Sequence, residues 1–422
     1  MRLGENMAAS HEGSSAQEVA QCTATESIRP LRWRDPFHPD PWASRTKLMQ
    51  RLISRDEAQL SMVRLSYFEG DPLADAMVLW MHETGMKQAW PIFELALTKG
   101  LQAVDDPHPT LKDFFRAIEH IPEWVKHEAL VRGCDMGVRT SRMGELIAFS
   151  SLLGGYAAVG LAKPLVATRS LDEIAALRLV ETTQWVYDVY NSRGLGRFSN
   201  GFISTVRVRV LHALVRNNLV SKGWDQERWG LPINQVDMGA TLLGFSINLL
   251  IGLRLVGMFI TPREGRDFMG LWRYVGYLIG VDDTFNPSTE IEAMKLIPLL
   301  IGSQEGPDDD SRSLAKSLLN TRFTRWPETQ LGRISARCDI NFRSALTRII
   351  SGRAAGDGLQ LPNSVFWKAV VVLLPIFNVL SEISRILIPG GTTRSTERGR
   401  QRFTRQMIKI SKGKRTNFGH RG

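Results

Sequence analysis

The sequence predicts an all-α protein built around one large helical domain. From about residue 46 onward, apolar residues recur at the three- and four-residue spacing of amphipathic helices, and few segments show the alternation that strands need. Capping signals mark several helix boundaries. A chain of 422 residues that is 43% hydrophobic and 23% charged is typical of a folded globular protein. We therefore expect a helical domain over residues 46–391 with a tail at each end.

The first 45 residues lack helical periodicity. Residues 1–30 are polar and rich in Ser, Ala and Gln, which favours disorder. The Pro- and Trp-containing stretch RPLRWRDPFHPDPW that follows is typical of an ordered, extended arm. No apolar stretch follows a basic start, so no secretory signal is visible and we expect an intracellular protein that is not secreted.

Helices within the domain are delimited by capping residues. The motif SLDE at Ser170 is a capping box that opens a helix ending near Gly194. The stretch SNGFIS begins the next helix, which stops by Gly223. At Thr261, TPRE combines a cap, an N1 proline and an N3 glutamate, and it opens a helix to about Gly280. Another helix is expected from Ser288.

Three uncharged or weakly charged runs are candidates for buried core helices. Leu146–Ala162 contains glycines and serines, Met238–Leu253 is short for a membrane span, and Val365–Leu380 contains a lysine and a proline. We interpret all three as core helices. The last run is the most open to membrane contact, because a strongly basic tail follows it.

The net charge of +10 is concentrated at the C-terminus. Residues 392–422 contain ten Lys or Arg and one acidic residue, Glu397, so the remaining chain is close to neutral. A neutral body argues against nucleic-acid binding, and the basic block predicts a disordered tail. An anionic membrane surface is a partner that this tail would suit. The three cysteines form no CxxC motif, so neither a zinc ribbon nor covalently attached c-type haem is supported.

One histidine lies in an arginine-rich stretch, RVRVLHALVR, within the second of these helices. Arg209 and Arg216 share a helix face with His212, three residues before it and four after it. Two nearby positive charges oppose protonation of the imidazole. A neutral imidazole between two guanidinium groups suits a metal whose cofactor carries carboxylates, and an ordinary basic helix surface would give the same pattern. His82 is the next candidate, and no HExxH, GxSxG, P-loop or GxGxxG motif is present.

The preceding helix carries polar residues on one face of an otherwise apolar stretch. Arg178, Glu181 and Thr182 are spaced at i, i+3 and i+4. They are costly to bury unless they serve one another or a bound group. The loop to the histidine helix is short, so the two helices are expected to be antiparallel neighbours whose faces sandwich a flat cofactor.

The order of these motifs resembles the latex clearing protein (rubber oxygenase) and mpaB-type oxygenase family. The resemblance rests on Arg178-x3-Thr182, on His212 thirty residues later, and on WGLPINQVDMGATLLGFS at 229–246. GDPLADA at 70–76 and LWRYVGYLIG at 271–280 fit the same pattern, and the likeness spans about residues 65–300.

The resemblance implies a globin-like helical fold enclosing non-covalent haem b. It gives His212 the role of proximal iron ligand, and Arg209 and Arg216 that of partners of the haem propionates. It places Arg178 and Thr182, with Glu181 between them, near the distal side, where oxygen is activated. Rubber-cleaving members have a lysine where this chain has Glu181.

The resemblance therefore implies an oxidoreductase that uses O2 on an apolar, isoprenoid or lipid-like substrate. The departure at Glu181 and the absence of an export signal argue against polyisoprene as that substrate. Two alternatives remain open at this point. One is a non-catalytic haem-binding protein, and the other is a helical membrane-surface protein without a cofactor.

Overall fold

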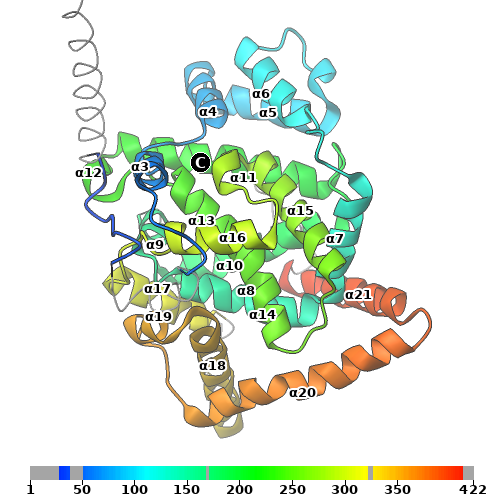
Figure 1. Ribbon diagram of the computed structural model, residues 1–422. Helices are drawn as coiled ribbons and strands as arrows, with labels where there is room; N and C mark the ends of the chain where they lie inside the picture. The colour runs from blue at the N-terminus through cyan, green and yellow to red at the C-terminus, as the bar shows by residue number, and fades with distance from the viewer. Residues whose placement is uncertain (1–27, 39–50, 168–170, 322–326, 412–422) are drawn as a thin grey trace, which may run out of the picture.

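The computed structural model confirms the all-α prediction. It describes residues 28–38, 51–167, 171–321 and 327–411, and within these ranges the chain forms α-helices and short 3-10 turns with no strand. Figure 1 shows a central stack of long helices, with a group of helices projecting from one end and a long helix lying across the other.

The N-terminal half supplies the projecting group and part of the central stack (Figure 1). Its helices are α3 (Glu57–Ser66), α4 (Pro72–Thr84), α5 (Met86–Lys99), α6 (Pro109–Glu119), α7 (His127–Arg139), α8 (Ser141–Gly155), α9 (Val159–Val166), α10 (Leu171–Asn191) and α11 (Asn200–Ser221).

The C-terminal half completes the stack and covers its far end. Its helices are α12 (Gln226–Trp229), α13 (Gln235–Phe245), α14 (Ile247–Leu255), α15 (Pro262–Ile279), α16 (Glu290–Leu300), α17 (Asp309–Asn320), α18 (Gln330–Ser351), α19 (Arg353–Gly358), α20 (Val365–Leu387) and α21 (Gly391–Ser411). Leu101–Ala103 and Asp283–Phe285 are 3-10 turns.

Capping residues start the helices much as the sequence predicts. The Ser199 side chain accepts a hydrogen bond from the backbone of Phe202 and starts α11. Thr261 and Glu264 form the capping box that starts α15. The cap of α16 is Thr289, one residue beyond the expected position. Ser170, the expected cap of α10, lies outside the described residues.

An aromatic cluster forms the centre of the core between α10, α13 and α15. Trp272 is fully buried and stacks on Phe245, with their ring centroids 5.2 Å apart. Trp185 packs edge-on against both rings. These large side chains set the separation of α10, α13 and α15.

The extended arm is ordered over residues 28–38 and is inserted into the body. The Arg32 side chain is buried, binds the Asp237 carboxylate at 2.7 Å and donates to the Gln304 side chain at 2.7 Å. The rest of the predicted segment 1–45 lies outside the described residues.

The prediction of a disordered tail over 392–422 is wrong for its first twenty residues. Residues up to Ser411 form α21, which packs on α7 and α10. Phe403 and Met407, one helical turn apart, are buried with Gly399. Arg400 binds the Asp135 carboxylate at 2.9 Å. The segment is rich in basic residues, so its composition does not indicate a narrow apolar face. That face packs on the body and stabilises the helix, which a disordered tail could not do.

The interpretation of Val365–Leu380 as a buried core helix is also wrong. By length and composition, two helical segments in the described part of the chain are long and apolar enough to cross a membrane. Gln235–Leu255 is 72% buried inside the protein, whereas Val365–Leu387, which is α20, is 11% buried. The bent pair formed by α8 and α9 passes the same test if counted as one span.

Candidate functional site

The histidine helix α11 lies between α10 on one side and α4 on the other. His212 is at its middle and is half-buried, with its Nδ1 atom inaccessible to solvent. The rival candidate His82 lies on α4 and is exposed. Of these two histidines, only His212 faces the interior.

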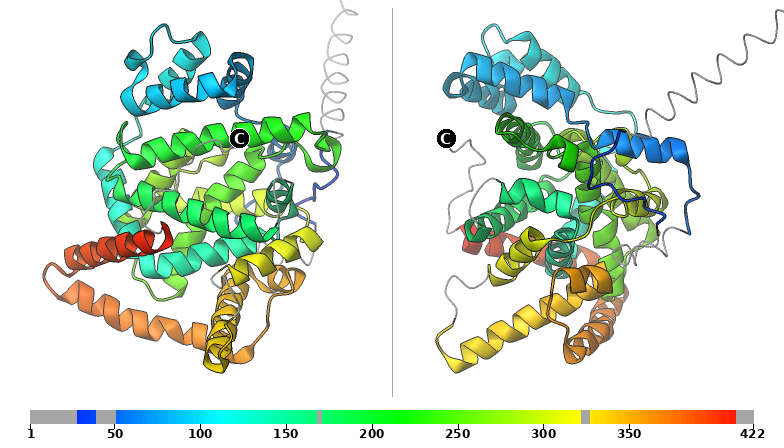
Figure 2. Two further views of the ribbon diagram at one scale, coloured as in Figure 1. Left: turned by 180° about the vertical axis from the view of Figure 1, so that it is seen from behind. Right: turned by 90° about the vertical axis from the view of Figure 1, so that its left-hand side faces the viewer.

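The expected antiparallel pairing of α10 and α11 is confirmed. Near the connecting loop, a Cβ atom on Gly201 would lie 2.8 Å from the carbonyl oxygen of Asp188, so the helices approach closely there. Further along, the Trp185 indole Nε1 donates a hydrogen bond of 3.0 Å to the Thr205 hydroxyl. The view from behind in Figure 2 shows these two long helices one above the other.

This pairing sets the register between the two predicted faces. His212 is seven residues beyond Thr205 on α11, and Arg178 is seven residues before Trp185 on α10. At 1.5 Å of rise per residue, both positions lie about 10 Å further along the helix pair. The backbone of residue 178 is therefore opposite His212. The Arg178 side chain lies outside the described part of the structure.

Glu181 and Thr182 lie on the same helix face as Trp185, four and three residues before it. Both side chains are half-buried. The register therefore directs them toward the segment of α11 that contains Arg209 and His212. Their distal role remains a prediction.

The two arginines beside the histidine bind carboxylates at the start of α4, those of the N-cap residue Asp71 and of Asp75. Arg209 is buried and forms two hydrogen bonds to Asp71, from Nε at 2.6 Å and from Nη2 at 2.9 Å. Arg216 binds Asp75 at 2.6 Å and donates to the carbonyl oxygen of Ile233 at 2.9 Å. Burial raises the pKa of Asp75, against the opposing effect of Arg216.

These ion pairs change the electrostatics that the sequence suggests. The positive charges of Arg209 and Arg216 are compensated by Asp71 and Asp75, so they do not act as two isolated charges beside His212. The binding of haem propionates by these arginines remains a prediction. It would require the propionates to share or displace carboxylates that already occupy the guanidinium groups.

Gln235, in the segment 229–246, is hydrogen-bonded to the backbone at the ends of the two other motif segments, 70–76 and 271–280. Its Nε2 donates to the carbonyl oxygens of Gly70 at 2.6 Å and Gly280 at 3.0 Å, and its Oε1 accepts from the backbone of Asp282 at 2.9 Å. Gly280 has a φ of 86°, and a Cβ there would lie 2.1 Å from an Asp71 oxygen. The four motif segments at 70–76, 207–216, 229–246 and 271–280 therefore converge around the histidine helix.

Sequence reasoning singled out these segments and assigned no role to Asp71, Asp75 or Gln235. Asp71 and Asp75 are one helical turn apart at the start of α4, which places them on one face, but this spacing does not identify Arg209 and Arg216 as their partners. Gln235 has no such local pattern, because its partners are backbone atoms distant in the chain.

Two comparisons with known proteins found a match. The family model described as "ER-bound oxygenase mpaB/B'/Rubber oxygenase, catalytic domain" matches residues 141–378, more than half of the chain. The chain belongs to this family. The family match contains α10 and α11, whereas α4 with Asp71 and Asp75 precedes it.

A solved structure described as latex clearing protein in the closed state is similar to this member of the rubber oxygenase family. The two share 17% sequence identity and superpose with a TM-score of 0.63, over 83% of this chain and 94% of that chain. At 17% identity, this similarity shows that the two proteins share a fold. No curated protein sequence matches the chain significantly.

The donor chemistry of this family member fits a metal that arrives with its own ligands. The described residues contain no group of three or more His, Cys, Asp or Glu placed to hold a bare ion. His212 instead offers one inward-facing imidazole beside buried, charge-compensated arginines. A porphyrin brings four nitrogen donors of its own and needs few ligands from the protein, so a single histidine is compatible with haem.

Proposed function

We propose that the protein is a haem b-dependent oxygenase that oxidises or cleaves an apolar, isoprenoid or lipid-like substrate with O2. Membership of the oxygenase family supports the reaction class. The observation that carries the haem assignment is the register of α10 and α11, which sets position 178 and its neighbours across from His212.

His212 would hold the haem iron through its imidazole. Haem, when bound, supplies the site at which O2 binds and is activated. The α11 backbone around His212 is fixed by the two ion pairs to α4 and by the bond between Trp185 and Thr205. Ligand orientation of this kind sets both cofactor affinity and reactivity.

The distal residues would act from α10. The Thr182 hydroxyl can donate a hydrogen bond and the Glu181 carboxylate can accept or hold a proton, whereas the Arg178 guanidinium carries a permanent positive charge. A carboxylate at this position cannot supply the amine that rubber-cleaving members place there, which supports a substrate other than polyisoprene.

Haem titration of the purified protein tests the proposal. We expect stoichiometric binding with a Soret band, and O2 consumption when a reductant and an isoprenoid alkene are present. Substituting the inward-facing histidine (His212→Ala) is expected to abolish haem retention, and substituting the exposed one (His82→Ala) to leave it unchanged.

Two results would contradict the proposal. Equal haem retention in both histidine variants would remove the assignment of His212. A stable Soret band with no O2 consumption on any isoprenoid or lipid alkene would favour a non-catalytic haem carrier.

A further inference from the structure

Helix α20 presents a continuous apolar surface to solvent. Phe377 is 71% exposed and Leu380 is 62% exposed, and most other large apolar side chains of the helix are exposed too. They include Phe366, Val372, Leu373 and Ile376. Soluble monomers rarely expose contiguous apolar patches of this kind, which mark protein or membrane contacts.

A narrow stripe of α20 attaches the helix to the body along its length. A Cβ on Gly257 would lie 2.6 Å from the Cα atom of Pro375, so the backbones touch there. Asn378 donates to the carbonyl oxygen of Val256 at 2.7 Å, one turn further on. Figures 1 and 2 show α20 lying across one end of the molecule, away from α4–α6.

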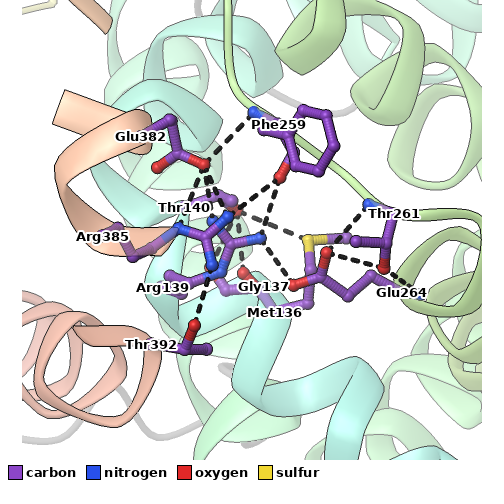
Figure 3. A network of polar contacts seen from close by, with 10 residues as sticks. All are labelled: Met136, Gly137, Arg139, Thr140, Phe259, Thr261, Glu264, Glu382, Arg385 and Thr392. Carbon is purple, nitrogen blue, oxygen red and sulfur yellow. Dashed lines mark hydrogen bonds and ion pairs between the residues drawn. The ribbon is translucent and has the colours of Figure 1, made fainter. Parts of the chain in front are cut away.

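A buried charge network fixes the C-terminal half of α20 (Figure 3). The Glu382 carboxylate accepts hydrogen bonds from the backbone of Phe259 and from Arg139, each at 3.2 Å. The Arg139 side chain is 1% exposed and also binds Glu264 at 2.8 Å. Arg385 of α20 also binds the Glu382 carboxylate at 3.0 Å, so these buried charges compensate one another. This helix is therefore fixed on the surface of the body and is not poised to leave it.

Helix α21 returns beside α20 and carries an exposed row of arginines. Arg394, Arg398, Arg402 and Arg405 are all exposed and follow one another at four, four and three residues, on the side opposite the buried stripe. Glu397 is the one acidic residue of this helix. An apolar helix beside a cationic helix is the combination that binds anionic lipid surfaces.

From these observations we infer that α20 lies in the plane of an anionic lipid bilayer, with its apolar side chains among the acyl chains and the α21 arginines among the headgroups. Spanning is disfavoured because the middle and the C-terminal half of α20 are attached to the body. Self-association through this face is disfavoured because it would bring two arginine rows together. The inference is independent of haem binding.

Co-sedimentation of the full chain with lipid vesicles tests the apolar surface. One variant replaces three exposed α20 side chains (Leu373→Glu, Phe377→Glu, Leu380→Glu), and a matched variant replaces exposed apolar residues elsewhere (Leu79→Glu, Leu95→Glu, Ile121→Glu). Each large apolar side chain moved out of water is worth roughly tenfold in partition or more. We expect the α20 variant to lose at least about 100-fold in binding to vesicles containing phosphatidylglycerol, and the matched variant to bind as wild type.

A second pair of variants tests the charges. Neutralising three α21 arginines (Arg398→Gln, Arg402→Gln, Arg405→Gln) is compared with neutralising three exposed lysines elsewhere (Lys87→Gln, Lys99→Gln, Lys222→Gln). Each cation near an anionic surface contributes about fivefold, so the α21 variant should bind about 100-fold more weakly at 0.1 M salt. At 1 M salt, where the Debye length is about 3 Å, or on phosphatidylcholine alone, it should match wild type.

Three outcomes would overturn the inference. The α20 variant, with wild-type circular dichroism, could sediment as well as wild type. Vesicle-bound wild type could resist carbonate extraction, which would indicate a spanning helix. Light scattering could show a lipid-free dimer that the α20 variant disrupts while wild type ignores vesicles, which would assign the face to a second copy.

Discussion

The ion pair between Arg209 and Asp71 makes the sharpest prediction about what holds the site together. Both side chains are more than nine-tenths buried and share two hydrogen bonds. Substituting Arg209→Met leaves a buried carboxylate without its partner, which costs about 3–5 kcal/mol in the free energy of unfolding. Substituting both residues (Asp71→Asn with Arg209→Met) removes both charges. The free energy of unfolding that the double variant loses should therefore be about 2 kcal/mol smaller than the sum of the losses in the two single variants.

Urea unfolding of the four proteins, followed by tryptophan fluorescence, measures this coupling. The exposed pair of Arg116 and Asp113 provides a matched control, because both side chains are more than half exposed. Arg116→Met should change the free energy of unfolding by no more than about 0.5 kcal/mol. A coupling free energy near zero for Arg209 and Asp71 would refute the view that this pair fixes α4 to the histidine helix. A loss confined to haem affinity, with no loss of stability, would instead favour propionate binding.

Three further predictions follow from the same structure. Changing two of the residues proposed to be distal (Glu181→Gln, Thr182→Ala) should preserve the Soret band and lower the rate of O2 consumption; loss of haem with an unchanged rate would make them structural. Burial raises the pKa of Glu264, but Arg139 and the helix cap outweigh it, so on balance the pKa is lowered below its ordinary value. The ion pair therefore stabilises the fold above the ordinary glutamate pKa of about 4.3, and this stability is lost as pH falls through the folded value. Glu264→Gln should flatten the acid limb of a stability–pH curve, and an unchanged limb would contradict this. Gly280→Ala should destabilise the fold, because φ is 86° and the new Cβ would meet a carboxylate oxygen of α4; a wild-type urea midpoint would contradict it.

Local features were predictable from the sequence. The caps at Ser199 and Thr261 depend on residues within one turn, so their signal is contained in three or four letters. The pairing of α10 with α11 follows from a connecting loop too short for any other arrangement. Both predictions are confirmed, and together they align the two candidate faces.

Long-range partners were not predictable in this way. Asp71 is 138 residues from Arg209, and nothing local in RVRVLHALVR distinguishes a guanidinium paired with a carboxylate from one that awaits a propionate. The exposure of α20 was missed because an apolar run looks the same whether protein or lipid covers it. The helix α21 was missed because Phe403 and Met407 are few among many charges.

Imidazole rescue of a His212→Gly variant tests the central claim most directly. Glycine removes the imidazole, and free imidazole from solution can then occupy the space that the side chain leaves. We predict that this variant fails to retain haem, and that added imidazole restores the Soret band of wild type. The same treatment of His82→Gly should change nothing. Full haem retention by His212→Gly without imidazole would contradict the account.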